Sequence, residues 1–313
     1  MESFYANQTG AVLSTAIDKY MYITAKERPS GIFKNTYRIS YSQTEIAGNR
    51  EEIQHPIVRE CLKTVRIDRR LEIVSIADLP AQAGMGSSSS FTVGLLQALH
   101  TMEGHTVSPK CLAEQACEVE IDRLLEPIGK QDQYIAAYGG LQFIQFQPDG
   151  RVFVDPVVCS PETRRELNRR LMLFYTGLTR NARDVLSKQR ANMQQKAPIL
   201  RKLCEIAHQL REILTDGRDL NQFGRLLHCA WEAKKCLEPS IHNSYIDKCY
   251  ERGLAAGALG GKLLGAGMGG FMLFFCEPHL RNRLREALAE LEEVPFALEP
   301  EGAKVIFVGT DQW

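Results

Sequence analysis

The sequence lacks several features that would assign a protein to a class at once. Its nine cysteines include no Cys-x-x-Cys pair, and its seven histidines show no metal-ligand spacing. This scatter argues against a disulfide framework or a zinc site and favours reduced thiols. There is no run of about 18 apolar residues, which a membrane-spanning helix needs, and the segment after Met1 has no basic and apolar leader region. We therefore expect a soluble, cytoplasmic protein.

Net charge is also lacking, because 38 basic residues balance 38 acidic ones. Without a net charge, the electrostatic field of the protein does not favour a nucleic acid or a membrane surface as its partner. Any anion must therefore be bound by a local site. We expect a small-molecule ligand, and a monomer or a homodimer.

Strand signals occur in both halves of the 313 residues. β-branched and aromatic residues predict strands at 11–24 and 36–42, joined most simply as a hairpin, and a further strand at Leu71–Ala77. Another hairpin is predicted between Leu141–Gln147 and Val152–Pro156, around a Pro-Asp-Gly turn.

Helical signals lie between these strands. A mixed helical stretch is predicted at 50–66, and the apolar spacing from Phe91 to Met102 fits a helix. Ser108 followed by proline predicts the N-cap of a helix over 109–125, with Leu112, Ala116 and Val119 pointing inward.

Composition shifts beyond residue 162, where we place a domain boundary. The second half begins with the strand Leu171–Tyr175 and closes with the strand Phe271–Cys276, a helix at 278–292 and a strand at Lys304–Val308. Together with the first half, this is an α+β pattern.

A loop rich in proline, glycine and serine, Pro80-Ala-Gln-Ala-Gly84-Met-Gly86-Ser-Ser-Ser-Ser90, lies between a predicted strand and a predicted helix. Its glycines allow backbone N–H groups to approach an anion, and the first helical turn adds unpaired N–H groups and a positive dipole end. A polyphosphate fits there, and a serine hydroxyl can bind Mg²⁺. The loop is neither a Walker loop nor a Rossmann fingerprint, because the required lysine and third glycine are missing. A capping loop without a ligand is the alternative interpretation.

Two carboxylates lie close together along the chain. Glu120 is near the end of the predicted 109–125 helix, and Asp132 follows in Gly129-Lys-Gln-Asp132-Gln-Tyr. Phosphoryl transfer needs one carboxylate to hold Mg²⁺ and often a second to orient or deprotonate the attacking hydroxyl. Taken alone, both are more simply explained as a solvated helix residue and a turn residue, and Glu118 competes with Glu120.

A second glycine-rich loop, Gly260-Gly-Lys-Leu-Leu-Gly265-Ala-Gly267-Met-Gly-Gly270, has six glycines in eleven residues. It directly precedes the predicted strand Phe271–Cys276. Such a loop either forms a tight turn with positive φ angles or packs its backbone closely against another group.

These three elements resemble, in order, motifs of the GHMP kinases, the family of galactose, homoserine, mevalonate and phosphomevalonate kinases. Pro-x-x-x-Gly-x-Gly-Ser-Ser at 80–88 is similar to the family's second motif, the Asp132 loop to the galactokinase-type catalytic loop, and the 260–270 loop to the third motif. The resemblance implies a two-domain α+β fold. Residues 1–162 would be an ATP-binding domain like domain 2 of ribosomal protein S5, and residues 163–313 a ferredoxin-like domain.

The resemblance also implies ATP and Mg²⁺ as cofactors and a role for each matched residue. Asp132 would orient the acceptor hydroxyl or accept its proton, and Ser88 and Glu120 would hold Mg²⁺. The residues expected to bind ATP are Pro80, Ala83, Gly84, Met85, Gly86, Ser87, Ser88 and Ser89.

Longer runs, such as Leu173-Phe-Tyr-Thr176-Gly-Leu-Thr179-Arg180, resemble one branch of the family, the D-glycero-D-manno-heptose 7-phosphate kinases. This implies phosphorylation of the anomeric hydroxyl to give the 1,7-bisphosphate, a step toward the heptose of bacterial surface lipopolysaccharide. The expected substrate-binding residues are Thr176, Thr179, Arg180, Gly265 and Gly267. A fucose- or galactose-type sugar kinase, a diphosphate decarboxylase and a non-catalytic sugar or nucleotide sensor are the alternatives.

The sequence departs from the family at its start. Family members place a strand with a basic residue and a glycine-rich turn before the segment that matches Gly10–Tyr20, whereas Met1 here falls inside that interval. An absent strand would leave backbone groups of its neighbour unpaired. The hypothesis is a start-site truncation, or a weakened or inactive family member.

Overall fold

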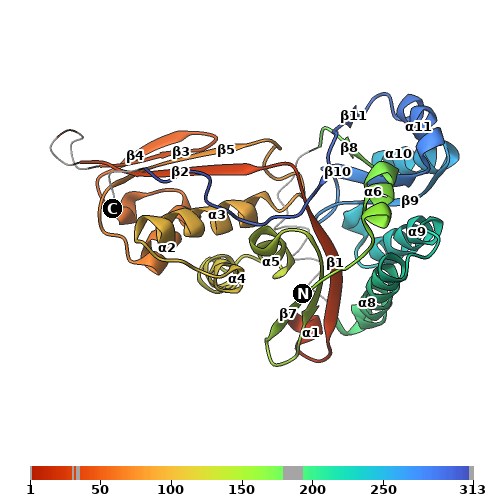
Figure 1. Ribbon diagram of the computed structural model, residues 1–313, viewed down its shortest axis with the longest axis horizontal. Coiled ribbons are helices and arrows are strands. Elements are labelled where there is room, and N and C mark those ends of the chain that lie inside the picture. The colour runs from red at the N-terminus through yellow and green to blue at the C-terminus, as the bar shows by residue number, and fades with distance from the viewer. Residues whose placement is uncertain (1, 30–31, 33–35, 179–192, 310–313) are drawn as a thin grey trace. The chain divides into compact units, whose positions relative to one another are not determined.

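A computed structural model describes residues 2–29, 32, 36–178 and 193–309 of the chain (Figure 1). The chain forms two compact units, each assembled from separate stretches of sequence. Unit 1 comprises Met1–Asp18, Ala81–Met85 and Gly140–Glu299, and unit 2 comprises Lys19–Pro80, Gly86–Gly139 and Pro300–Trp313. The domain boundary placed near residue 162 stays a prediction.

Unit 2 is built on a four-stranded sheet with the order β2-β5-β3-β4. Its strands are β2 (Met21–Glu27), β3 (Tyr37–Ser40), β4 (Thr44–Ala47) and β5 (Leu71–Ala77). Strands β3 and β5 run parallel, and the other neighbours are antiparallel. Its helices are η1 (Arg50–Glu52), α2 (Pro56–Val65), α3 (Ser87–Met102), α4 (Pro109–Cys117), the π-helix η2 (Glu118–Arg123) and α5 (Gln131–Tyr138). Helix α3 packs on β2 and lies along one face of the sheet in Figure 1.

Unit 1 contains two four-stranded antiparallel sheets, with the orders β12-β1-β6-β7 and β11-β8-β10-β9. The strands are β1 (Gly10–Ile17), β6 (Leu141–Phe146), β7 (Val152–Pro156), β8 (Leu171–Tyr175), β9 (Ala258–Leu263), β10 (Phe271–Cys276), β11 (Glu292–Glu293) and β12 (Leu298–Glu299). The helices are α1 (Glu2–Tyr5), α6 (Pro161–Arg170), α8 (Met193–Asp216), α9 (Asn221–Lys235), η3 (Pro239–Ile241), α10 (Ser244–Ala255), η4 (Pro278–Leu280) and α11 (Arg281–Ala287).

Helices cover the sheets of unit 1 with their apolar sides. Helix α8 packs against β1, and α9 packs against β9 and β10. Burial of aromatic rings such as Phe143, Phe223 and Phe275 in one cluster, and of Trp231 and Phe274 in a second, removes large apolar areas from water. This unit is therefore held by sheet–helix packing on an extended apolar core.

Several sequence predictions are confirmed. The strand at Leu71–Ala77 is β5, and β6 and β7 form the predicted antiparallel hairpin. The hydroxyl of Ser108 accepts a hydrogen bond from the N–H of Cys111 at 3.2 Å, which makes Ser108 the N-cap of α4. The three residues predicted to point inward from this helical segment are buried: Leu112, Ala116 and Val119.

The single strand predicted at 11–24 is wrong. The segment forms β1 in unit 1 and β2 in unit 2, and β2 pairs with β5 instead of forming a hairpin with β3. Aspartates satisfy the backbone on both sides of the break. Asp18 Oδ1 accepts from the N–H of Ala297 at 2.8 Å, and Asp78 Oδ2 accepts from the N–H of Tyr20 at 2.8 Å.

The strand predicted at Lys304–Val308 is also wrong, because this segment has no strand conformation in the described chain. Its apolar side chains are exposed. β-propensity measures how a side chain packs on a paired, half-buried surface, so an apolar run without a strand partner stays irregular.

Two predicted helices are shorter than expected. The segment 109–125 is α-helical only to Cys117 and then continues as the π-helix η2, and the segment 278–292 is α-helical only over Arg281–Ala287. Among the helices in the described part of the chain, none has the length and apolarity needed to cross a membrane.

Candidate functional site

The loop at Pro80–Ser90 lies where the sequence predicted it, between β5 and α3. Gly84 and Gly86 have positive φ angles of 79° and 69°, a region that glycine enters without strain. Gly86 is the N-cap of α3 and has no side chain to cap the helix. The first turn therefore offers backbone N–H groups at the positive end of the dipole, as an anion site requires.

The first half of this loop packs against the second glycine-rich loop within unit 1. A Cβ atom at Gly265 would lie 2.4 Å from the Cα of Gly84, and one at Gly270 would lie 2.2 Å from the carbonyl oxygen of Ala83. No side chain fits at either point. The glycines therefore allow two backbones to meet directly, which is one of the two interpretations that the sequence left open.

Residues 260–263 of the second glycine-rich loop belong to strand β9, so only residues 264–270 connect β9 to β10. This connection is held by two further contacts. The ammonium group of Lys234 donates to the carbonyl oxygens of Gly265 at 2.6 Å and Leu263 at 3.2 Å. The N–H of Met268 donates to the carbonyl of Ile241 at 2.6 Å. Sequence reasoning missed Lys234, because a lysine in the last turn of a helix has no distinctive pattern.

In unit 2, Glu120 is the centre of a buried polar cluster. Its side chain is 0 % exposed. Its Oε2 accepts hydrogen bonds from Ser89 Oγ at 2.9 Å and Gln133 Nε2 at 2.7 Å, and its Oε1 accepts one from Ser88 Oγ. Three elements, α3, η2 and α5, thus converge on one carboxylate. The competing residue, Glu118, is instead paired with Arg123 at 2.5 Å.

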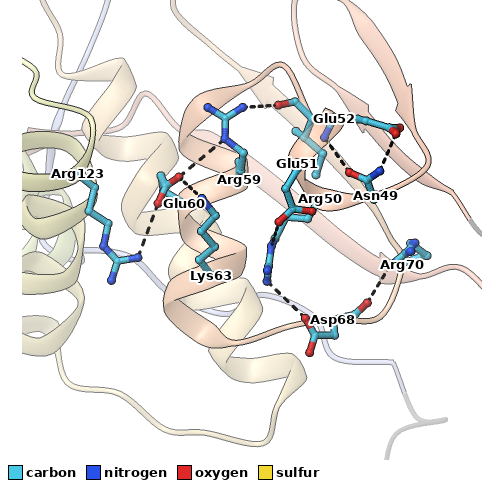
Figure 2. Close-up of polar contacts among 11 residues, drawn as sticks. Asn49, Arg50, Glu51, Glu52, Arg59, Glu60, Lys63, Asp68, Arg70 and Arg123 are labelled. Carbon is cyan, nitrogen blue, oxygen red and sulfur yellow. Dashed lines mark hydrogen bonds and ion pairs between the residues drawn. The ribbon is translucent and has the colours of Figure 1, made fainter.

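Figure 2 shows an ion pair between the end of the π-helix η2 and helix α2. Arg123, its last residue, lies 3.8 Å from Glu60 of α2, and Lys63 contacts the same carboxylate at 2.8 Å. π-turns are rare and occur often at functional sites. Here the turn directs Glu120 into the unit while Glu118 and Arg123 stay at its surface.

Burial raises the pKa of the Glu120 carboxyl, and the negative charge of Asp132 adds to this, although the hydrogen bonds from Ser88, Gln133 and Ser89 oppose it. A cation would relieve the cost of this buried charge. The donors present, a carboxylate and the hydroxyl of exposed Ser88, are hard oxygens that suit Mg²⁺. Within the described residues, no cluster of three or more His, Cys, Asp or Glu side chains forms a self-sufficient metal site. A metal would therefore complete its coordination with water and ligand oxygens.

Asp132 lies in the first turn of α5, directly beside the start of α3. A Cβ atom at Gly86 would lie 3.3 Å from Asp132 Cβ and 3.5 Å from its Oδ2. Gln131 Nε2 donates to Asp132 Oδ1 at 3.1 Å. The structure thus brings Asp132, Gly86, Ser88 and Glu120 together in one unit.

The predicted substrate residues are less fully described. Thr176 is buried, and its hydroxyl donates to the carbonyl of Gly270 at 2.9 Å and accepts from the N–H of Gly270 at 3.1 Å. Its side chain therefore joins β8 to the glycine loop, and its contact with a substrate stays a prediction. Gly265 and Gly267 lie in that loop with φ angles of 69° and 122°. Thr179 and Arg180 lie outside the described residues.

Gln133 is a site residue that sequence reasoning missed, although it directly follows Asp132 in the predicted catalytic loop. The available signal was a polar residue beside buried Tyr134 and Ala137 on a short helix. A buried amide at such a position needs a partner, and here that partner is Glu120.

Two family models match, GHMP kinases N terminal domain over residues 56–140 and GHMP kinases C terminal over residues 199–293. The chain is 28 % identical to the D-glycero-alpha-D-manno-heptose 7-phosphate kinase of Campylobacter jejuni, over 95 % of this chain and 91 % of that protein. It is also 28 % identical to the bifunctional fucokinase/GDP-fucose pyrophosphorylase of Arabidopsis thaliana, over 82 % of this chain and 27 % of that protein.

A solved structure shares the fold. A D-glycero-D-manno-heptose 1-phosphate kinase from Bacteriodes thetaiotaomicron superposes with a TM-score of 0.77 at 23 % identity, over 96 % of this chain and 92 % of that one. The first family model spans the loop at Pro80–Ser90, Glu120 and Asp132, and the second spans Lys234 and the second glycine-rich loop. The chain belongs to the GHMP kinases.

Proposed function

We propose that this protein is an ATP-dependent sugar kinase that phosphorylates the anomeric hydroxyl of D-glycero-D-manno-heptose 7-phosphate and yields the 1,7-bisphosphate. The observation that carries the proposal is the arrangement of Ser88, Glu120 and Asp132 around the start of α3. The heptose phosphate is favoured as substrate because the Campylobacter jejuni relative matches 95 % of the chain.

Each residue has a definite part in the proposed reaction. The backbone N–H groups at residues 84–88 bind the β- and γ-phosphates of ATP, and Asp132 orients the sugar hydroxyl or accepts its proton. Ser88 and Glu120 hold Mg²⁺, which when bound neutralises phosphate charge. We also assign Gly265, Gly267 and Arg180 to substrate binding, because the guanidinium group of an arginine suits a phosphate. The rate enhancement comes from positioning and charge neutralisation, and no covalent intermediate is required.

The reaction is tested by incubating pure protein with ATP, Mg²⁺ and a panel of sugars and sugar phosphates. We expect ATP consumption with heptose 7-phosphate and a new anomeric phosphate signal in the ³¹P NMR spectrum. Preferred turnover of free fucose would instead favour the second candidate, a fucose kinase, for which the Arabidopsis thaliana relative is the reason. Nucleotide binding without any turnover across the panel would overturn both in favour of a non-catalytic sensor.

The place of the reaction follows from its product. An anomeric phosphate on a heptose is the acceptor group that nucleotidyl transfer requires. We therefore propose a role in nucleotide-activated heptose synthesis in the cytoplasm, before lipopolysaccharide assembly. Detection of the enzyme in a cytoplasmic fraction, and loss of heptose from the polysaccharide when its gene is deleted, would test this assignment.

A further inference from the structure

Gln133 is a fully buried amide that the proposed reaction leaves without a role. It has 0 % exposure and follows Asp132 in the first turn of α5. Its Nε2 donates to Glu120 Oε2 at 2.7 Å. Its Oε1 is buried and has no hydrogen-bond partner among the described residues. An apolar side chain at this position would leave the buried Glu120 carboxylate with one donor fewer.

The orientation of the amide is fixed by its partner. If the side chain were turned by 180°, its carbonyl oxygen would face the Glu120 carboxylate and repel it, so the NH₂ group must point toward Glu120. The unpaired Oε1 is the consequence. The role of the Gln133 amide is therefore to donate a hydrogen bond from Nε2 to Oε2 of Glu120.

The two oxygens of Glu120 have different surroundings. Oε2 is held by two buried donors, Ser89 and Gln133, whereas Oε1 is bonded to Ser88, which is exposed. With Oε2 occupied from inside the unit, the carboxylate cannot rotate freely about its terminal bond. Oε1, which accepts from the Ser88 hydroxyl, is therefore the oxygen that faces away from the two buried donors.

We infer that Gln133, together with Ser89, is a positioning residue that fixes the Glu120 carboxylate so that Oε1 alone is presented to a divalent cation beside Ser88 Oγ. The inference rests on the proposed function, since it assigns Gln133 to the metal that this function requires. Because Asp132 and Gln133 are consecutive, the same helical turn sets both the carboxylate that acts on the sugar and the one that binds the metal. Groups that orient a metal ligand in this way commonly tune metal affinity by about 10- to 100-fold.

The test is Gln133→Met, which keeps an unbranched side chain of similar length and removes the donor. Mn²⁺ binding is followed by electron paramagnetic resonance in the presence of a non-hydrolysable ATP analogue, so the readout does not depend on turnover. We expect the Kd for Mn²⁺ to rise about 10-fold or more. The Mg²⁺ concentration for half-maximal activity should rise in parallel, while the KM for ATP at saturating Mg²⁺ changes by less than about twofold.

Two further variants separate positioning from a general loss of structure. Ser89→Ala should move the Mn²⁺ affinity in the same direction, and the double variant should lose less than the two single losses combined, because both donors act on one oxygen. Gln115→Met is the matched control. It removes an amide that lies 2.8 Å from His100 Nε2 and joins α4 to α3 away from Glu120, so its Mn²⁺ affinity should equal that of the wild type.

Wild-type protein that binds Mn²⁺ and turns over sugar phosphate, with unchanged Mn²⁺ affinity in Gln133→Met, would overturn the inference and leave the proposed function standing. An equal loss in Gln115→Met would also overturn it, because the effect would then be structural. Wild-type protein that binds no Mn²⁺ in the presence of the nucleotide analogue would overturn the proposed function, and the inference with it.

Discussion

Gly86 meets two requirements that no other residue type satisfies together. Its φ angle of 69° is strained for any residue with a Cβ atom, and that atom would lie 3.3 Å from Asp132 Cβ and 3.4 Å from its Cγ. Gly104, at the other end of α3, has a similar φ of 70°, but a Cβ atom there would have nothing within 4 Å. Substitutions at Gly86 and Gly104 therefore separate the effect of backbone strain from the effect of displacing the Asp132 carboxylate.

Gly86→Ala and Gly104→Ala should each destabilise the protein by about 1–2 kcal/mol, the usual cost of the left-handed conformation for an alanine. Only Gly86→Ala should also lower kcat, by roughly 10- to 100-fold, since small displacements of a reacting group have effects of this size. Chemical denaturation and steady-state kinetics measure the two quantities. Equal kcat values in both variants would show that the contact with Asp132 is irrelevant to turnover.

Asp132→Asn keeps the size of the side chain and removes its basicity. We expect kcat to fall roughly 10²-fold or more, in the range of general-base catalysis, while nucleotide affinity stays within about twofold. Asp122→Asn is the control, because Asp122 is an exposed residue of η2. Near-normal turnover of Asp132→Asn would remove Asp132 from the proposed mechanism.

Glu120 gives a prediction on pH. Burial raises the pKa of its carboxyl, so the folded protein binds this proton more tightly than the unfolded chain does. The stabilisation is complete below the unfolded-state pKa and is lost as the pH rises through the folded-state pKa. In metal-free buffer, Glu120→Gln should therefore raise the melting temperature relative to wild type more at about pH 8 than at about pH 5. Activity should fall in the same variant, because the proposed Mg²⁺ site loses a ligand.

Glu118→Gln is the control for this prediction, since the side chain of Glu118 is 46 % exposed and paired with Arg123. It should show no gain in melting temperature that grows with pH. A gain of the same size at both pH values in Glu120→Gln would contradict the shifted pKa.

At the scale of elements, the sequence predicted those features that depend on neighbouring residues. Strand β5, the cap at Ser108 and the hairpin of β6 and β7 each depend on neighbouring residues and were predicted correctly. The division of 11–24 between β1 and β2 depends on pairing with distant strands, and a local pattern does not contain this information. The π-turn at η2 was missed for a related reason, since its contacts with α2 come from tertiary packing.

The same distinction applies to the site. Glu120 and Asp132 were proposed by motif, whereas Gln133 has only a weak local signal and Lys234 has none, because both donate to atoms distant in the sequence. Their roles emerge only from the tertiary structure.

Lys234 connects α9 to the second glycine loop through bonds to Gly265 and Leu263. Hydrogen bonds from a charged donor contribute about 1.5–3 kcal/mol. Lys234→Met should therefore speed amide hydrogen exchange in the loop at 264–270 and raise the KM for ATP by up to about tenfold. Lys235→Met, which removes the 2.8 Å ion pair of Lys235 with Glu232, should leave both unchanged. Wild-type exchange in the loop of Lys234→Met would rule out this anchoring role.

At the scale of the whole molecule, the absence of net charge and an exposed apolar segment both favour self-association. Equal numbers of basic and acidic residues give no charge repulsion between molecules near neutral pH. Ile306 and Phe307 are 74 % and 82 % exposed in a segment of high β-propensity, which is the kind of sequence that promotes association.

Replacing both residues, as Ile306→Thr with Phe307→Ser, should reduce self-association near pH 7 as measured by light scattering. Because neither side chain is packed, the free energy of unfolding should change by no more than about 0.5 kcal/mol. Ile73→Thr is the contrasting variant. Ile73 is 0 % exposed in β5, and placing a hydroxyl there should cost about 2 kcal/mol or more. If the double variant instead lost as much stability as Ile73→Thr, the segment at 305–308 would have to be part of the packed structure, and its exposure could not explain association.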